Sequence, residues 1–291
     1  MSSTQHHIIY ILFPRKKAMP NQITRADLHN HINYKSIHTF DEIINAIEAN
    51  MGGNSLIGLA NFGEEDKRYE NFVSSSGYER INHNNAIYIP EKRILIVKGQ
   101  EIPTREGHIL ALGIPSNHTI KSGRNLEDTL KEIKENFDAL IILDHPFSFG
   151  GAIETMKKHP KLFENIDGIE IFNGEVSFGM PFTPLLSRAN QKAFAFYEEY
   201  KSLYPHLGAI ISSDGHRIEE YGKSFTFISL PQLKSLNSPE KINASLKQAI
   251  RNSKGYGRRY WGGAFYGLIH ILEIIKRQGI NKIIQRVKEK T

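Results

Sequence analysis

The sequence predicts an α/β protein, either a closed β/α barrel or an open doubly wound sheet. Short apolar runs rich in β-branched residues alternate with helical patterns along most of the 291 residues. Several runs, such as Ala139–Leu143, are apolar at every position. Strands of that kind are typical of mostly parallel sheets that helices cover on both faces. A hydrophobic content of 40% is enough for one large core or two modest ones.

Eight runs are expected to be strands because each is short, apolar and bounded by turn or cap residues. Two of them flank Thr104–Gly107 and are expected to pair as a hairpin. In chain order, the expected strands are Ala26–Leu28, Leu56–Ala60, Ile94–Ile102, His108–Ile114, Ala139–Leu143, Gly168–Phe172, Leu207–Ser212 and Phe225–Leu230. The polar stretch Gly63–Asn85 is the one long segment without clear periodicity.

Four helices are expected between these strands. A capping-box pattern at Thr39–Glu42 opens the first of them. Asn125 can cap a second helix over Leu126–Phe137, and a third pattern covers about Leu185–Tyr204. The fourth helix spans about Pro239–Ile250, with proline in its first turn.

The chain divides most simply into one domain, residues 1–250, and a basic C-terminal helical extension, residues 251–291. The formal net charge is +6, and the extension holds ten Lys or Arg against two Glu, so residues 1–250 carry a net charge of −2. Three interpretations of the extension stay open. Its aromatic residues Tyr260, Trp261 and Phe265 pack on the barrel, or its arginines and aromatic rings bind nucleic acid, or it pairs with a partner helix.

The absence of cysteine excludes disulfides, thiolate zinc sites and cysteine nucleophiles. Any metal ion must therefore be bound by His, Asp, Glu or Asn. The longest early apolar run, Ile8–Phe13, is too short for a membrane span or a signal peptide. We therefore expect a cytoplasmic protein that is not embedded in a membrane; its oligomeric state is left open.

Residues that can bind metal follow several of the expected strands. His29 and His31 lie two positions apart, so in a strand both side chains point to one face. Reactive groups gather at the carboxyl ends of parallel strands, so these residues are expected to meet at one end of the fold. The candidates are His29, His31, Glu101, Asp144, His145, Asn173, Asp214 and His216. Oxygen and nitrogen ligands without thiolates suit zinc, manganese or iron.

The chain resembles the PHP superfamily, the polymerase and histidinol phosphatase domains, over about Ala26–Ile250. The motifs that carry the resemblance are ADLHNH, KGQE, GHILALGI, LDHP and SSDGH, in that order. The resemblance implies a distorted (β/α)7 barrel that holds up to three divalent metal ions and hydrolyses phosphoesters.

The resemblance also implies roles for single residues. By position, His29, His31, Glu101 and Asp214 would bind one metal ion, Glu101 would bridge to a second ion at His145, and His216 would reach a third. Two cations can hold a hydroxide and clamp the phosphate oxygens, so no side-chain nucleophile is required. Asp27 would orient one of the metal ligands without binding the metal ion itself.

Two departures from the family concern the third metal ion. The family has an acidic turn after its His-x-His motif, where this chain reads YKSIHTF, and its Thr-Asp-His motif corresponds to Ala60, Asn61 and Phe62. Phenylalanine cannot bind a cation, so two tightly bound ions are expected rather than three. His216 is then expected to contact phosphate or to act as an acid. In EEDKRYE, residues 64–70, Arg68 is a candidate for binding phosphate, and the alternative is a solvated charged loop.

The sequence thus predicts a metal-dependent phosphoric ester hydrolase. Its expected substrate is a phosphomonoester or phosphodiester, a nucleotide or a nucleic acid, and His216 or Arg68 is expected to act on the phosphate or the leaving group. The alternative is a PHP-like barrel without turnover that serves as a binding or regulatory module through its basic extension. The residues at Asn61 and Phe62 motivate that alternative.

Overall fold

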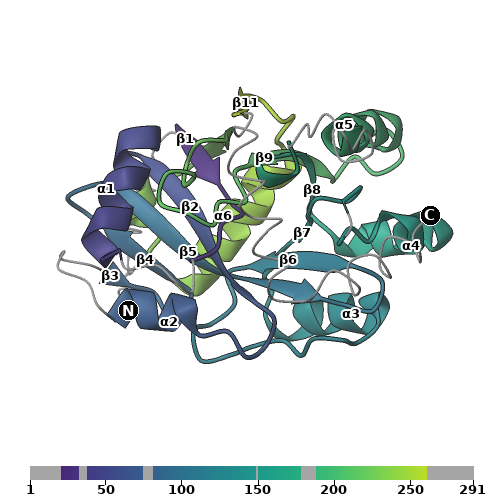
Figure 1. The fold of residues 1–291 in the computed structure, drawn as a ribbon, viewed down its shortest axis with the longest axis horizontal. Coiled ribbons are helices and arrows are strands. Elements are labelled where there is room, and N and C mark those ends of the chain that lie inside the picture. Colours follow the sequence, from purple (N-terminus) through teal and green to yellow (C-terminus); the bar gives the residue numbers. More distant parts are fainter. Residues whose placement is uncertain (1–20, 33–37, 75–80, 149, 178–187, 261–291) are drawn as a thin grey trace, which may run out of the picture.

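The computed structural model describes residues 21–32, 38–74, 81–148, 150–177 and 188–260. In these ranges the chain forms a closed β-barrel with helices around it (Figure 1). The prediction of an α/β barrel is confirmed. The open sheet is excluded because β2 (Ser55–Phe62) pairs in parallel with β5 (Ile94–Pro103) over their whole shared length and closes the ring.

Eight of the described strands make up the ring. In ring order they are β2, β1 (Gln22–Asp27), β10 (Phe225–Leu230), β9 (Gly208–Ser212), β8 (Gly168–Asn173), β7 (Leu140–Leu143), β6 (His108–Leu112) and β5. Outside the ring, β3 (Ile81–Asn82) pairs with β4 (Ala86–Ile89), which pairs with β5. The two-residue β11 (Gly257–Arg258) pairs with β10.

The sheet is mixed, which corrects the expectation of a mostly parallel one. β6 and β10 run antiparallel to both of their neighbours in the ring. The other six strands of the ring share one direction, because the pairs β1–β2, β2–β5, β7–β8 and β8–β9 are parallel. Their carboxyl ends therefore lie together at one end of the barrel, here called the site end. β6 and β10 begin at that end.

All four expected helices are present, at α1 (Phe40–Met51), α3 (Leu126–Asn136), α5 (Ala189–Tyr200) and α6 (Pro239–Arg251). The capping box of α1 is complete, because the Thr39 hydroxyl accepts from Glu42 N and the Glu42 carboxylate accepts from Thr39 N. α5 is shorter than expected. Residues 201–204 form turns, and 185–187 lie outside the described residues.

Five short elements were not expected: α2 (Arg68–Ser74), α4 (Ile153–Lys158) and the 3₁₀ turns η1 (Pro160–Asn165), η2 (Glu175–Ser177) and η4 (Leu233–Ser235). Each is at most seven residues long, too short to show a helical period in the sequence. α2 and β3 lie within the stretch 63–85, so that stretch is not simply a solvated loop.

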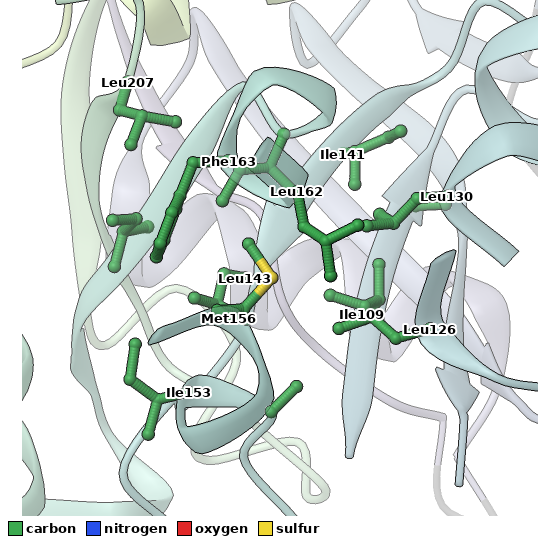
Figure 2. Close-up of a cluster of buried hydrophobic side chains, with 14 of the residues drawn as sticks. Ile109, Leu126, Leu130, Ile141, Leu143, Ile153, Met156, Leu162, Phe163 and Leu207 are labelled. Carbon is green, nitrogen blue, oxygen red and sulfur yellow. The ribbon is translucent and has the colours of Figure 1, made fainter. Parts of the chain in front are cut away.

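The barrel has an apolar interior and is covered on the outside. Leu28, Val97 and Leu110 lie in the interior cluster, which α6 joins through Ile242 and Leu246. A second cluster fills the space between β6–β9 and the helices α3, α4 and α5 (Figure 2). A third cluster lies between α1 and the strands β2, β4 and β5.

Helix α6 closes the barrel at the end opposite the site end. Gly208 begins β9, and a Cβ atom there would lie 1.7 Å from the carbonyl oxygen of Ile250. The backbone of the helix end therefore approaches the start of the strand so closely that glycine is required. Among the described residues, no helix combines the length and apolar character needed to cross a bilayer.

The described start of the C-terminal extension lies on the barrel. β11 extends the sheet beside β10, Arg258 Nε donates to the Lys223 carbonyl at 2.7 Å, and Tyr260 N donates to Ser224 Oγ at 3.0 Å. Trp261, Phe265 and the basic residues that follow them lie outside the described residues. Nucleic-acid binding and a partner helix therefore stay predictions for that part of the extension.

Candidate metal centre

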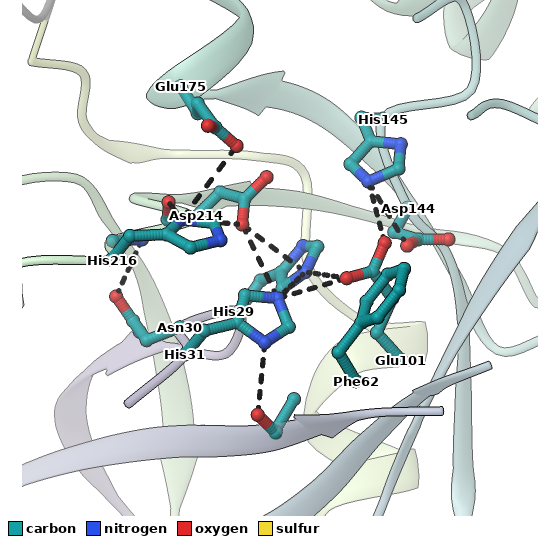
Figure 3. A network of polar contacts seen from close by, with 12 residues as sticks. His29, Asn30, His31, Phe62, Glu101, Asp144, His145, Glu175, Asp214 and His216 are labelled. Carbon is teal, nitrogen blue, oxygen red and sulfur yellow. Dashed lines mark hydrogen bonds and ion pairs between the residues drawn. The ribbon is translucent and has the colours of Figure 1, made fainter. Parts of the chain in front are cut away.

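The site end brings together residues that are far apart in the sequence. His29 and His31 follow β1, Glu101 lies near the end of β5, His145 follows β7, and Asp214 follows β9 (Figure 3). Their ligand atoms form three groups that could each hold a cation, with all atoms of a group within 4.8 Å of one another. These groups are His29, Glu101, Asp144 and His145; His29, His31 and Asp214; and Glu175, Asp214 and His216.

Four ligand atoms converge at the centre of the site: Nε2 of His29, Nε2 of His31, Oε2 of Glu101 and Oδ1 of Asp214. The two nitrogens lie 3.2 Å apart. The nitrogen-to-oxygen distances are 3.7 and 3.0 Å to Glu101 and 3.5 and 3.6 Å to Asp214. Zinc bonds of about 2.0–2.1 Å in a tetrahedron separate ligand atoms by about 3.3 Å, so these distances match those between ligands of one ion. The ligand atoms that all lie within 4.8 Å of one another here are those of His29, His31 and Asp214, and Glu101 approaches the two histidines from the second group.

Hydrogen bonds on the far side of each ring fix which nitrogen faces the centre. His29 Nδ1 lies 3.2 Å from Glu170 Oε1, and His31 Nδ1 lies 3.0 Å from the Ala60 carbonyl oxygen. A carbonyl can only accept, so His31 carries its proton on Nδ1 and directs the Nε2 lone pair to the centre. Partners of this kind behind a histidine are characteristic of metal ligands.

Glu101 links this centre to a second one through its other oxygen. Glu101 Oε1 lies 2.5 Å from His108 Nδ1 and 3.1 Å from His145 Nε2. Asp144 Oδ2 lies 3.4 Å from the same nitrogen of His145. The expected bridging position of Glu101 between two groups of nitrogen ligands is therefore present in the geometry.

The third group lies nearest the solvent. His216 Nδ1 is 3.8 Å from Glu175 Oε2 and 3.9 Å from Asp214 Oδ1, and its bond of 3.0 Å to the Asp214 carbonyl fixes the ring. The side chains of His216 and Glu175 are 29% and 25% exposed. The ring of His216 lies 4.8 Å from that of His31, so it is at the mouth of the central site.

The site concentrates negative charge that its histidines only partly balance. Glu101, Asp144, Glu170 and Asp214 are all buried, and within the described residues their ion-pair partners are histidines. Burial opposes protonation of His29, but Asp214 and Glu170 raise its pKa well above the usual value. Burial lowers the pKa of His31, which favours the neutral form that binds metals.

The carboxyl groups respond to burial in different ways. Burial, together with repulsion from Glu101, raises the pKa of Asp144 to about 7 against the attraction of His145. Burial also disfavours the ionised form of Glu101, but His108 and the other histidines around it hold its pKa well below the usual value. Glu101 is therefore an ionised carboxylate at neutral pH and suits a bridging role.

Unsatisfied oxygen atoms test whether these residues fit a cation. Both carboxylate oxygens of Asp144, together with Oδ1 of Asp214, are buried without a hydrogen-bond partner among the described residues. Leaving such a group unpaired is costly, and a charged oxygen costs more than a neutral one. A divalent cation beside them would remove that cost, so the residues fit metal ions.

The structure gives Arg68 and Asp27 different surroundings from those expected. Arg68 donates to both oxygens of Asp66 and to the Ile32 carbonyl, which gives no support to a role in binding phosphate. Asp27 does not contact a ligand ring. Its oxygens accept from Ser213 N and Gly222 N, each at 2.9 Å, so it positions the loop that carries Asp214 through the backbone.

Three residues of the site did not emerge from the sequence. His108 begins a strand that runs in the reverse direction, Glu170 lies inside the apolar run of β8, and Glu175 follows that strand in η2. The rule that ligands follow strand ends could not identify the first two. Asn173, which was a candidate, donates to Glu170 Oε2 and Asp214 Oδ2 at 2.9 Å and so orients two carboxylates.

The fold is similar to that of a two-domain protein from Bacteroides vulgatus that contains a predicted PHP-like metal-dependent phosphoesterase. The TM-score is 0.52 at 18% sequence identity, and the match covers 89% of this chain and 70% of the other. At this identity the similarity concerns the fold, and it confirms the resemblance to a PHP-type barrel. No model of a known protein family matches the sequence, and no curated protein is significantly similar to it.

Proposed function

We propose that this protein is a metal-dependent phosphoesterase whose reaction takes place at the site end of the barrel. One observation carries the proposal: the Nε2 atoms of His29 and His31 lie 3.2 Å apart and 3.0–3.7 Å from carboxylate oxygens of Glu101 and Asp214 at the site end. The fold shared with a PHP-like protein supports a phosphoric ester as the substrate class. Phosphomonoesters and phosphodiesters both remain candidates.

Within this proposal, each group of ligands has a distinct task. His29, His31, Glu101 and Asp214 would hold the first cation. His145 and Asp144 would join Glu101 at the second, where His108 bonds Glu101 Oε1 at 2.5 Å and Ser148 Oγ keeps His145 in place at 2.9 Å from its Nδ1. Divalent cations there supply positive charge that polarises the phosphate and lowers the pKa of an attacking water.

We expect His216 to act on the substrate. It lies at the mouth of the site beside His31, and its Nδ1 is held by the Asp214 carbonyl. From that position it would contact a phosphate oxygen or transfer a proton to the oxygen of the leaving group. The Asp214 carbonyl can only accept and therefore keeps a proton on Nδ1, so both tasks require a second proton on Nε2 and belong to the protonated imidazole.

We expect two tightly bound metal ions per chain. The third group has two partly exposed members at 3.8 and 3.9 Å, and Phe62, with no ligand atom, stands beside His31 and His108. Metal analysis of purified protein should give about two equivalents. Three tightly bound equivalents would contradict this expectation.

A substrate screen with a matched pair of variants tests the function. Wild-type protein with added manganese or zinc should hydrolyse a generic phosphomonoester or phosphodiester, and a chelator should abolish the activity. His29→Ala should lose it, whereas His118→Ala should retain it, because His118 is exposed and belongs to none of the three groups. Silence of the wild type in every assay, together with binding to RNA or DNA, would instead favour the binding module.

A further inference from the structure

Phe62 points into the mouth of the site. It is paired with Glu101 across β2 and β5, and residues paired on neighbouring strands project from the same face of the sheet. Asn61, one residue earlier, points to the outside and bonds Glu70 and Tyr69 N of α2. The alternation of the strand therefore places the Phe62 ring on the same side as the Glu101 carboxylate, as Figure 3 shows.

The ring of Phe62 is exposed although it stands among buried ligands. The residue is 46% exposed, whereas Glu101 is 4% and His31 1% exposed. Its centroid lies 5.5 Å from that of His108 and 6.4 Å from that of His31, both in edge-to-face arrangements. Close to half of the Phe62 residue is thus available to solvent, beside the groups that would hold the phosphate.

The backbone beneath the ring is held from both sides. Phe62 N donates to Asp66 Oδ2 at 2.8 Å, and Gly63 N donates to the Glu101 carbonyl at 2.9 Å. Arg68 in turn holds Asp66 through two bonds of 2.8 Å and ties it to the Ile32 carbonyl. Arg68 is therefore a positioning residue, and the ring presents its face without a large loss of freedom on binding.

We propose that Phe62 is the platform on which an aromatic or heteroaromatic part of the substrate stacks. This inference depends on the proposed phosphoesterase function and narrows its substrate class to phosphate esters that carry a flat, unsaturated group near the ester oxygen. An aromatic ring with an open face beside a polar site gains most from another ring, because stacking adds to the burial of apolar area. Aryl esters and nucleotides both satisfy this chemistry.

Binding of two phosphonates to metal-loaded protein tests the platform without turnover. Benzylphosphonate and cyclohexylmethylphosphonate differ in the flatness of the ring. Calorimetry should show the wild type binding the benzyl compound about 3- to 10-fold more tightly. Phe62→Leu, which keeps apolar bulk, should abolish that preference, and Phe62→Tyr should retain it. Phe227→Leu is the matched control, because Phe227 is 44% exposed on β10 and contacts none of the ligands.

The outcomes separate this inference from the proposed function. If both phosphonates bind and Phe62→Leu keeps the wild-type ratio of affinities, the platform is wrong while the phosphoesterase stands. If neither phosphonate binds to the metal-loaded wild type, the phosphate site itself is wrong and the platform is overturned with it. Comparing kcat/KM for AMP and ribose 5-phosphate then distinguishes nucleotides from other aryl esters as the substrate. If Phe62→Leu lowers kcat/KM for AMP but not for ribose 5-phosphate, a nucleobase stacks on the ring.

Discussion

Two polar clusters lie on opposite sides of the strands β2 and β5. Only the outer cluster contains a lysine that pairs with its carboxylate. The outer cluster consists of Asn61, Glu70, Lys98 and Gln100, on the side of β2 and β5 that faces α2. The inner cluster consists of the ligands around Glu101. Alternate residues of β5 therefore serve the two clusters in turn.

In the outer cluster, a carboxylate and backbone carbonyls of the chain itself pair with the ammonium group of Lys98. Lys98 is 1% exposed, its Nζ lies 2.7 Å from Glu70 Oε1, and it donates to three backbone carbonyls of residues 115, 116 and 118 at 2.9–3.1 Å. Glu70 Oε1 and oxygens of Asp144 and Asp214 are all buried without a hydrogen bond, but Glu70 Oε1 lies beside a lysine ammonium, whereas the ion-pair partners of the two inner carboxylates within the described residues are histidines. The comparison indicates that the carboxylates of the inner cluster suit a positive charge that the chain itself does not supply, such as that of a metal ion.

The largest expected effect is at Glu101, where Glu101→Gln keeps the shape and removes the bridging charge. Since metal ions contribute several kcal/mol to such a transition state, activity should fall about 1000-fold. Adding manganese or zinc should raise the melting temperature of the wild type but not of the variant. If the variant keeps both the activity and the metal-dependent rise in melting temperature, the inner cluster does not need the Glu101 charge to bind metal, and the proposed difference between the two clusters is wrong.

The second effect is on stability. Lys98→Met should lower the free energy of unfolding by about 3 kcal/mol, because it leaves three partly buried carbonyls and the Glu70 carboxylate without their donor. Urea denaturation measures this. The two clusters are distinct only if the variant still binds the wild-type number of metal ions, so metal analysis of the same preparation completes the test.

A smaller effect is expected behind the first metal ion. Glu170→Gln removes the carboxylate that holds His29 Nδ1 while keeping its size. A residue that holds a metal ligand in place without touching the ion contributes about 10- to 100-fold to metal affinity. Competition with a chromogenic chelator should show that loss in this variant, and unchanged affinity would show that the Glu170 contact is only structural.

The smallest effect concerns pH and the outer cluster. Burial raises the pKa of Glu70, but Lys98 and Asn61 lower it further, so the pKa is below its usual value. A carboxyl with a lowered pKa in the folded state stabilises the protein above its unfolded pKa of about 4.3, and that contribution disappears as the pH falls through the folded pKa.

Thermal melts of the wild type and Glu70→Gln measure this contribution. The wild type should be more stable at pH 7 by about 1 kcal/mol, because Glu70 is partly exposed and solvent screens the pair. The difference should vanish in acid. A difference that persists at the lowest pH would mean that Glu70 acts through packing and not through charge.

The sequence predicted the inner cluster better than the path of the strands around it. His29, His31, Glu101, His145 and Asp214 follow or end strands of one direction, so a rule about carboxyl ends identified them even though the sheet is mixed. His108 was missed because strand direction depends on pairings between distant segments, which hydrophobic periodicity does not contain. Glu170 was missed because a single carboxylate in an apolar run has no local signature.

Strand β1 lies between β2 and β10, so the ring closes only when segments from near both ends of the described chain meet. His29 and Asp214 are joined by a backbone hydrogen bond of 2.8 Å although they lie 185 positions apart in the sequence. Contacts of such long range form slowly, because the entropy of closing the loop is lost before the contact stabilises it. During synthesis on the ribosome, the candidate metal centre therefore cannot assemble until the segment that carries Asp214 has emerged.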